Sequence, residues 1–146
     1  MAAKLTIRIA TNQELEDIFS HAQKVFEEST MGLSENQEPF LMSPFMEEDG
    51  NYLVYSEDGV LKGWIGIASL FNHFGGERVG MIIEIYVIPE HRKQGIAQQL
   101  CMEGVRYLKE RGHHKIQLNV FAGNRAKQLY QKLGYYEVST LMEKRI

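Results

Sequence analysis

The sequence predicts an α/β fold in which one mixed β-sheet is covered by helices. The chain has 146 residues, which suits a single domain with its own core. Hydrophobic residues make up 44% and charged residues 24%, the balance of an ordinary soluble globular protein. Segments with strand-like alternation and segments with helical spacing follow one another, as expected for a sheet flanked by helices.

The first elements are a strand and a helix. Residues 5–9 alternate apolar and polar side chains, which predicts a strand. Thr11 or Asn12 is placed to cap a following helix, because apolar residues then recur at helical spacing as far as Phe26. Residues 32–50 contain two prolines and predict a loop that holds a short helix.

Three strands follow in the middle of the chain. Residues 51–56 and 60–70 predict a hairpin, because Glu-Asp-Gly at 57–59 is a turn signal. Residues 81–88 are apolar at nearly every position, which is typical of a strand buried on both faces. This strand is expected to stop at Pro89.

The last part of the chain predicts two helices and further strands. A helix is expected over residues 95–111, since apolar residues form a stripe and a glycine follows its end. Residues 115–120 predict a strand and residues 124–133 a second helix. Residues 136–146 are expected to form one or two final strands.

Charge, hydropathy and cysteine content limit the function. The formal net charge of -3 disfavours binding to a nucleic acid backbone. The sequence has no apolar run near the ~20 residues of a membrane helix and no apolar signal segment near its start. The single cysteine, Cys101, cannot form an internal disulfide. These features predict a cytoplasmic protein with no nucleic acid or membrane partner.

The segment after the buried strand has the features of an anion site. It passes through Arg92 and Lys93 into a helix that begins near Gly95. A helix N-terminus offers unpaired N–H groups and a partial positive charge, so phosphates bind there. Gly95 has no Cβ, which lets an anion approach the backbone closely. For one glycine alone, a tight strand-to-helix turn is an equally good explanation.

Two segments carry a family resemblance. Residues 85–97 resemble motif A of the GCN5-related N-acetyltransferase (GNAT) superfamily, with Arg, Gly and Ala at its three fixed places. Residues 124–135 are similar to the family segment that runs from Asn through Leu-Tyr to Gly-Phe, with Tyr135 in place of Phe. The order of strands and helices also matches over nearly the whole chain. The resemblance implies that residues 1–146 are a single N-acetyltransferase domain.

This resemblance implies the acyl-CoA N-acyltransferase fold, a mixed, mostly antiparallel sheet with a splayed parallel strand pair and flanking helices. Acetyl-CoA is then the acyl donor, and its pantetheine arm lies in the splayed gap. A backbone N–H near Val87 would bind the thioester carbonyl. The implied cofactor-binding residues are Tyr86, Val87, Ile88, Arg92, Lys93, Gln94, Gly95, Ile96, Ala97, Asn119, Asn124, Lys127 and Tyr130.

Two residues are candidates for proton transfer. By resemblance, Tyr130 protonates or hydrogen-bonds the leaving thiolate. As an alternative, Tyr130 is a core aromatic. Glu84 is an acid in an otherwise apolar strand, where burial would raise its pKa towards the range of a base. A structural pairing of Glu84 is an equal alternative. Some relatives carry a glutamate where this chain has Asn119, which cannot act as a base.

The sequence therefore predicts acetyl transfer from acetyl-CoA to a primary amine by direct attack in a ternary complex. The acceptor is a small molecule or a peptide, with a wall expected from residues 26–45 and 71–77. No metal site is expected, because the histidines have no partners at metal-ligand spacing. A non-catalytic acyl-CoA-binding or regulatory module is the alternative. A homodimer is compatible with the resemblance.

Overall fold

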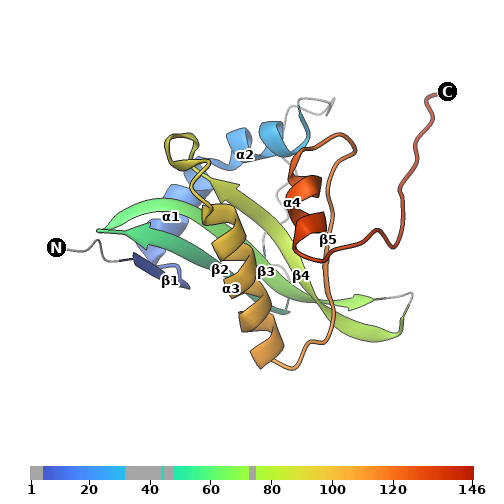
Figure 1. The fold of residues 1–146 in the computed structure, drawn as a ribbon, viewed down its shortest axis with the longest axis horizontal. Helices are drawn as coiled ribbons and strands as arrows, with labels where there is room; N and C mark the ends of the chain where they lie inside the picture. The colour runs from blue at the N-terminus through green and yellow to red at the C-terminus, as the bar shows by residue number, and fades with distance from the viewer. Residues whose placement is uncertain (1–4, 32–43, 45–47, 73–74) are drawn as a thin grey trace.

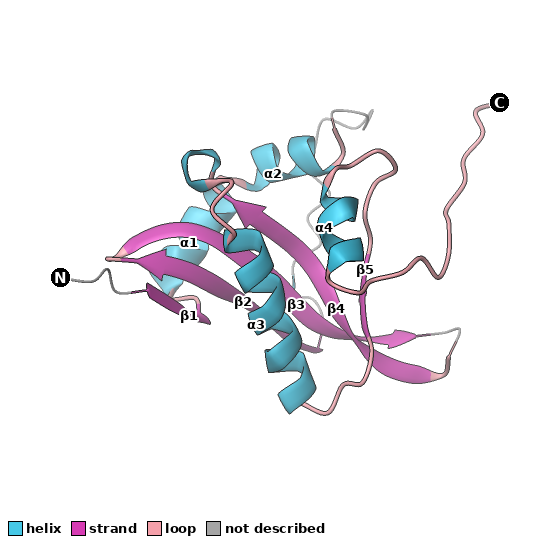
Figure 2. Ribbon diagram, in the orientation of Figure 1, coloured by secondary structure: helices cyan, strands magenta, loops and turns pink. Residues whose placement is uncertain are grey.

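The fold is a five-stranded sheet with helices on both faces (Figure 1). It is seen in a computed structural model that describes residues 5–31, 44, 48–72 and 75–146. Figure 2 shows α3 crossing one face of the sheet and α1 behind the other. The strands are β1 Leu5–Ile9, β2 Glu48–Glu57, β3 Val60–Asn72, β4 Glu77–Val87 and β5 Ile116–Leu118. The helices are α1 Asn12–Ser20, α2 Ala22–Ser29, α3 Ile96–Glu110 and α4 Ala126–Lys132.

The sheet has the order β1-β2-β3-β4-β5. Each of the first three strands pairs antiparallel with the next one, whereas β4 and β5 are parallel. The parallel pairing runs only from Gly80↔Ile116 to Ile82↔Leu118. Beyond Ile82, β4 continues without β5 as a partner. The predicted mixed and mostly antiparallel sheet is confirmed.

The predicted first helix is divided into two. Thr11 caps α1: its side chain accepts a hydrogen bond from the Glu14 N–H at 3.2 Å, and the Glu14 carboxylate accepts one from the Thr11 N–H at 2.9 Å. This capping box fixes where α1 begins. The helical spacing continues past His21, but the backbone there leaves helical geometry, with φ -94° and ψ 0°. His21 thus ends α1 and precedes α2.

The apolar side chains of the sheet form two cores, one on each face. The first, which we call the α3-side core, consists of Leu53, Tyr55, Ile65, Ile67, Ile82, Ile96, Leu100 and Leu108. The second, the α1/α2-side core, consists of Ile18, Val25, Tyr52, Val54, Trp64 and Tyr86. Side chains alternate between faces along a strand, so β2, β3 and β4 each supply both cores.

One irregularity in β4 changes which face its side chains reach. Gly66 pairs with Glu84, but the next residue of β3, Ile67, pairs with Ile82. Ile83 is therefore an extra residue, a β-bulge, and the alternation of side chains reverses across it. Ile82 packs in the α3-side core, whereas Tyr86, four residues later, packs in the α1/α2-side core. The bulge thus turns Glu84 away from the α3 side.

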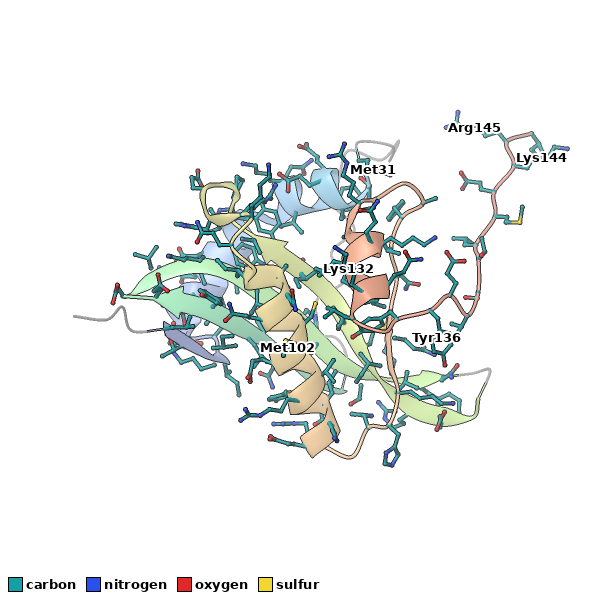
Figure 3. All side chains as sticks on the ribbon, viewed as in Figure 1. Met31, Met102, Lys132, Tyr136, Lys144 and Arg145 are labelled. Atoms are coloured by element: carbon teal, nitrogen blue, oxygen red, sulfur yellow. The ribbon has the colours of Figure 1, made fainter. Side chains whose placement is uncertain are left out.

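The strands predicted at the end of the chain do not form. Residues 135–146 are irregular, and their large apolar side chains are exposed: Tyr136 is 82% and Leu141 is 99% exposed. Figure 3 shows Tyr136, Lys144 and Arg145 along this segment. A strand needs a hydrogen-bonded neighbour, and alternation of side chains alone does not provide one.

Within the ranges that the structure describes, no helix is both long enough and apolar enough to cross a bilayer.

Candidate active site

A large cleft opens where β4 and β5 separate. Its volume is about 1790 Å³, above the ~300–1,000 Å³ of a typical small-molecule pocket. Helices α1, α2 and α4, strand β4 and the start of α3 all contribute to its wall. Of the predicted site residues, the lining contains Glu84, Tyr86, Val87, Arg92, Lys93, Gly95, Ile96, Ala97, Asn119, Asn124 and Tyr130. Ile88, Gln94 and Lys127 lie outside it.

The backbone of β4 presents hydrogen-bonding groups to this cleft. The Ile88 N–H donates to the Lys62 carbonyl at 2.8 Å, so this N–H is directed to the β3 side. Because successive backbone groups of a strand point in opposite directions, the Val87 N–H is directed to the gap left by β5. The Val87 carbonyl accepts a hydrogen bond from Arg92 Nε at 2.8 Å.

The loop between β4 and α3 is shaped to receive an anion. Lys93 and Gly95 both have positive φ, 64° and 79°, and Gly95 is the N-cap of α3 with no side-chain capping bond. The first N–H groups of a helix have no acceptor within the helix. A Cβ built on Gly95 would meet no atom within 4 Å. Ile96 is buried in the α3-side core, so its N–H is the group it offers to the cleft.

The guanidinium of Arg92 is held by the protein itself. It donates to the Glu28 carboxylate at 2.6 Å and lies 5.1 Å from the centre of the Tyr86 ring. Together with its bond to Val87, these contacts connect α2, β4 and the loop. The sequence pattern does not predict the ion pair between Arg92 and Glu28, because the two residues are 64 positions apart.

Asn124 and Lys127 are also engaged by neighbouring residues. Asn124 Oδ1 accepts from the Ala126 N–H at 2.9 Å at the start of α4, where Arg125 and not Asn124 is the N-cap residue. The Asn124 side-chain amide donates to the Ser29 carbonyl at 3.2 Å, and so joins α4 to the end of α2. Lys127 forms an ion pair with Glu137.

Tyr130 belongs both to the protein interior and to the cleft. It is 7% exposed, it lines the cleft, and its ring centre lies 5.9 Å from that of Tyr135. Burial raises the pKa of Tyr130 above its ordinary value, and the neighbouring Cys101 and Tyr135 raise it further. The phenol therefore keeps its proton well above neutral pH. Both interpretations of this residue, core aromatic and proton donor, are compatible with its position.

Glu84 lines the same cleft and is fixed by Trp64. The indole N–H donates to Glu84 Oε2 at 2.6 Å. Burial raises the pKa of Glu84 above its ordinary value, and this hydrogen bond offsets part of the rise. A carboxylate with a raised pKa is a better proton acceptor near neutral pH. The structural pairing anticipated for Glu84 is present, and it involves a neutral donor.

Other parts of the site lie at the cleft margin. Asn119 follows β5, is exposed and lines the cleft. From the expected acceptor wall, Phe26, Glu28, Ser29 and Thr30 line the cleft, and residues 32–43, 45 and 73–74 lie outside the described part of the chain. The second part of that wall was predicted wrongly, because its described residues 71, 72 and 75–77 do not line the cleft. Phe19, which was not anticipated, lines it from α1. Among the described residues, no group of three His, Cys, Asp or Glu side chains is arranged to hold a metal ion.

Comparison with known proteins identifies the family. The Acetyltransferase (GNAT) family profile matches residues 12–135. The chain belongs to this family. An N-acetyltransferase from Archaeoglobus fulgidus that is described as uncharacterized is 30% identical over 138 residues, with 86% of this chain and 89% of the relative covered. The GNAT fold is also found in the aminoglycoside N-acetyltransferase AAC(6')-Iy in complex with CoA, at TM-score 0.71 and 19% identity, with 100% and 97% covered.

A further GNAT relative is substantially longer. Mycothiol acetyltransferase from Saccharomonospora viridis is 31% identical over 100 residues, which cover 66% of this chain and 33% of the relative. The chain thus spans about a third of the length of the curated mycothiol acetyltransferases that it matches.

Three functional contacts were not predicted from the sequence: those made by Trp64, Glu28 and Ser29. For Trp64, the polar N–H of a tryptophan side chain indicates in general that a buried indole needs a hydrogen-bond partner. Glu28 and Ser29 lie near the end of a helix and carry no local signal for contacts with the loop or with α4.

Proposed function

We propose that this protein transfers the acetyl group of acetyl-CoA to a primary amine by direct attack in a ternary complex. The observation that carries the proposal is a line along the cleft wall from the Val87 N–H in the β4 gap to the N–H groups at the start of α3, with the N–H groups of Ile88, His91 and Arg92 bonded within the protein. This line suits a thioester arm that ends in a pyrophosphate. Membership of the GNAT family, and a structural neighbour solved with CoA, support the same donor.

The donor would be held mainly by backbone groups. The N–H groups of residues 93–97 would bind the pyrophosphate, with Gly95 leaving room for its oxygens. The Val87 N–H would bind the thioester carbonyl, and Asn119 lies on the opposite wall of the gap. Arg92 would act by holding the loop to Val87 and Glu28, since its guanidinium already bonds both. Acetyl-CoA itself supplies the acetyl group as an activated thioester.

Proton transfer would be divided between two side chains. A primary alkylamine has a pKa near 10.4 and arrives protonated, so it must lose a proton before it attacks. Glu84 is positioned to take that proton, because it lines the cleft and its raised pKa suits a base. Tyr130, which stays protonated, would give its proton to the departing sulfur. Water can relay the proton to Glu84 where the amine does not reach it.

The acceptor class is a small-molecule or peptide amine. The names of similar proteins refer to mycothiol, to aminoglycosides and to the alanine of a ribosomal protein, so they include small-molecule and protein acceptors. On the acceptor side, α1 and α2 contribute Phe19, Ala22 and Phe26 to the cleft wall. Turnover of a panel of amines, measured as CoA release, would identify the acceptor. A protein that binds acetyl-CoA without any turnover would instead be the non-catalytic module.

Isothermal titration with acetyl-CoA tests the donor. Gly95→Ala should weaken binding at least about tenfold, because its Cβ would point into the space intended for the anion. Gly59→Ala is a matched control: Gly59 has nearly the same φ, 78° against 79°, and equally open surroundings, but it lies in the β2–β3 turn. Both variants should lose a similar amount of stability. Equal affinity of the two variants for acetyl-CoA would argue against the loop as the pyrophosphate site.

A pH–rate profile tests the base. The wild-type rate should fall on the acidic side with an apparent pKa above the ordinary value of glutamate, since burial raises the pKa of Glu84. Glu84→Gln should lower turnover about 10²-fold or more and abolish this acidic limb. An acidic limb that remains in the variant would exclude Glu84 as the base.

A further inference from the structure

The hydrogen bond between Trp64 and Glu84 joins a fully buried side chain to one that lines the cleft. Trp64 is 0% exposed, and its Nε1–H donates to Glu84 Oε2 at 2.6 Å. A short bond from a neutral donor to a carboxylate is among the stronger hydrogen bonds in proteins. It fixes one carboxylate oxygen from inside the protein, and among the described residues no hydrogen bond engages Oε1, which is the oxygen that a ligand in the cleft would meet.

Sheet geometry produces this pair. Trp64 lies opposite Tyr86 in the β3–β4 pairing, and Glu84 lies opposite Gly66, so the two side chains are diagonal neighbours. Positions two apart on a strand share a face, so Trp64 and Gly66 of β3 and Glu84 and Tyr86 of β4 all face the α1/α2 side. The bulge at Ile83 lies beyond this pairing and places Ile82 on the other face, in the α3-side core. The regular pairing of β3 with β4 therefore brings the carboxylate to the indole.

The indole is itself held by rings from two other segments. Its ring centre lies 5.1 Å from Tyr86 of β4 and 5.4 Å from His21, between α1 and α2. Tyr52 of β2 is the other titratable group that interacts with Glu84. Trp64 is thus confined on its ring faces, and its N–H has a constant direction.

We propose that Trp64 is a positioning residue, which holds Glu84 in the one orientation in which Oε1 can take the proton of the amine acceptor. This inference rests on the proposed function of Glu84 as the base. In the step itself, the N–H bond of the ammonium breaks, its proton passes to Glu84 Oε1, and the amine keeps the electron pair. The products are a neutral carboxylic acid and a neutral amine. Trp64 keeps its own proton throughout.

A direct readout follows because Trp64 is the single tryptophan of the chain. Its fluorescence should change as Glu84 ionises, since the hydrogen-bond acceptor of the indole gains or loses charge. Titration of the ligand-free protein should show a transition above the ordinary pKa of glutamate, because burial raises the pKa of Glu84. No substrate, and no change to the buried indole, is needed for this measurement.

Two variants assign the fluorescence transition. The His21 ring lies beside the indole, so it is the competing source of a signal. The transition should disappear in Glu84→Gln and remain in His21→Gln. A transition that survives in Glu84→Gln and is lost in His21→Gln would overturn the proposed link between Trp64 and the ionisation of Glu84.

A double-mutant cycle, measured by enzyme kinetics, tests whether Trp64 positions Glu84. The indole N–H favours the ionised carboxylate, so Trp64→Phe should raise the pKa of Glu84 and move the acidic limb of kcat/KM up by about one pH unit. Affinity for acetyl-CoA should be unchanged, which also checks that the variant folds. The double variant with Glu84→Gln should show no further effect of Trp64→Phe on the pH profile.

The possible outcomes separate this inference from the proposed function. A fall in kcat without a pH shift, or an additional loss in the Glu84→Gln background, would give Trp64 a merely structural role and overturn the positioning proposal. An acidic limb retained by Glu84→Gln alone would overturn the assignment of the base, and the positioning proposal with it. Failure of acetyl-CoA to bind the wild-type protein would reject the enzyme activity itself.

Discussion

The two faces of the sheet have different kinds of core. The α3-side core is built from aliphatic side chains and one tyrosine, with the helix α3 lying along it. The α1/α2-side core contains Tyr52, Trp64 and Tyr86 and borders the carboxylate of Glu84. The aliphatic side chains of the α3-side core pack without polar groups. The aromatic side chains of the α1/α2-side core have polar ends, which can hydrogen-bond a charged group at its edge.

On the proposed function, this difference places a proton donor and a proton acceptor in the same cleft. Tyr130 lies on the α3 side, near Cys101 of that helix, and Glu84 lies on the α1/α2 side. Burial raises the pKa of both, but the consequences differ: the tyrosine stays an acid, and the glutamate becomes a stronger base. Because the sheet is open between β4 and β5, the two groups line the same cleft.

Removal of packing from the α3-side core should affect stability and leave catalysis intact. Leu100 is 0% exposed in α3, and Leu100→Ala should lower the unfolding free energy by about 2–5 kcal/mol. Denaturant titration would measure this loss. Met102→Ala is a matched control on the same helix, because Met102 is 59% exposed on its outer surface (Figure 3). A changed pH–rate profile of the folded Leu100→Ala protein would mean that the two cores are not independent.

Removal of the phenol should affect catalysis and leave packing intact. Tyr130→Phe keeps the ring against Tyr135 and deletes only the hydroxyl. Turnover should fall about 10²-fold, with acetyl-CoA affinity and melting temperature nearly unchanged. Single-turnover rates and calorimetric titration would measure both. An unchanged turnover would leave Tyr130 as a core aromatic only.

The charge on Glu84 should make the α1/α2 side less stable as pH rises. Its folded-state pKa is raised, so its contribution to stability is present below the ordinary value of 4.5 and lost as pH passes through the raised value. Glu84→Gln should therefore melt about a few degrees higher than wild type at pH 8 and at the same temperature at pH 4. Glu57→Gln, which loses an ion pair with Lys62, should not melt higher at pH 8.

The smallest effect is expected for the ion pair between Arg92 of the loop and Glu28 of α2. Glu28→Gln removes the partner of Arg92, but both side chains are more than a third exposed, so the loss of stability should be below about 1 kcal/mol. Glu110→Gln breaks a comparable exposed pair with Arg106 far from the cleft. A larger loss of acetyl-CoA affinity in Glu28→Gln than in this control would show that the bridge supports the loop.

Much of the fold could be predicted because its signals are local. The capping residue Thr11, the apolar strand before Pro89 and the glycine at the start of α3 all act on their immediate neighbours. The break at His21 could not be predicted, because the helical spacing continues through it. The final segment was predicted wrongly, because its alternating side chains have no neighbouring strand to pair with.

The sequence predicted the candidate site only where the residues of the site lie close together along the chain. The loop from Arg92 to Ala97 follows from the sequence, but the bulge at Ile83 depends on how β4 pairs with β3. The orientation of Glu84 and its bond to Trp64 also depend on that pairing. A single sequence carries no signal for a two-against-one pairing between strands that meet after folding.

The short pairing of β5 has a consequence for the lifetime of the protein. From Ile83 to Val87, β4 has no partner strand on its β5 side among the described residues, and an edge of this kind leaves backbone groups open to a binding partner. A ligand that binds only the folded chain adds about 2.7 kcal/mol to its stability at 100 times its Kd. On the proposed function, the pantetheine arm of acetyl-CoA binds along β4 in the place of a partner strand, and it can dissociate. Depletion of this metabolite would then shorten the survival of the enzyme as well as stop its reaction.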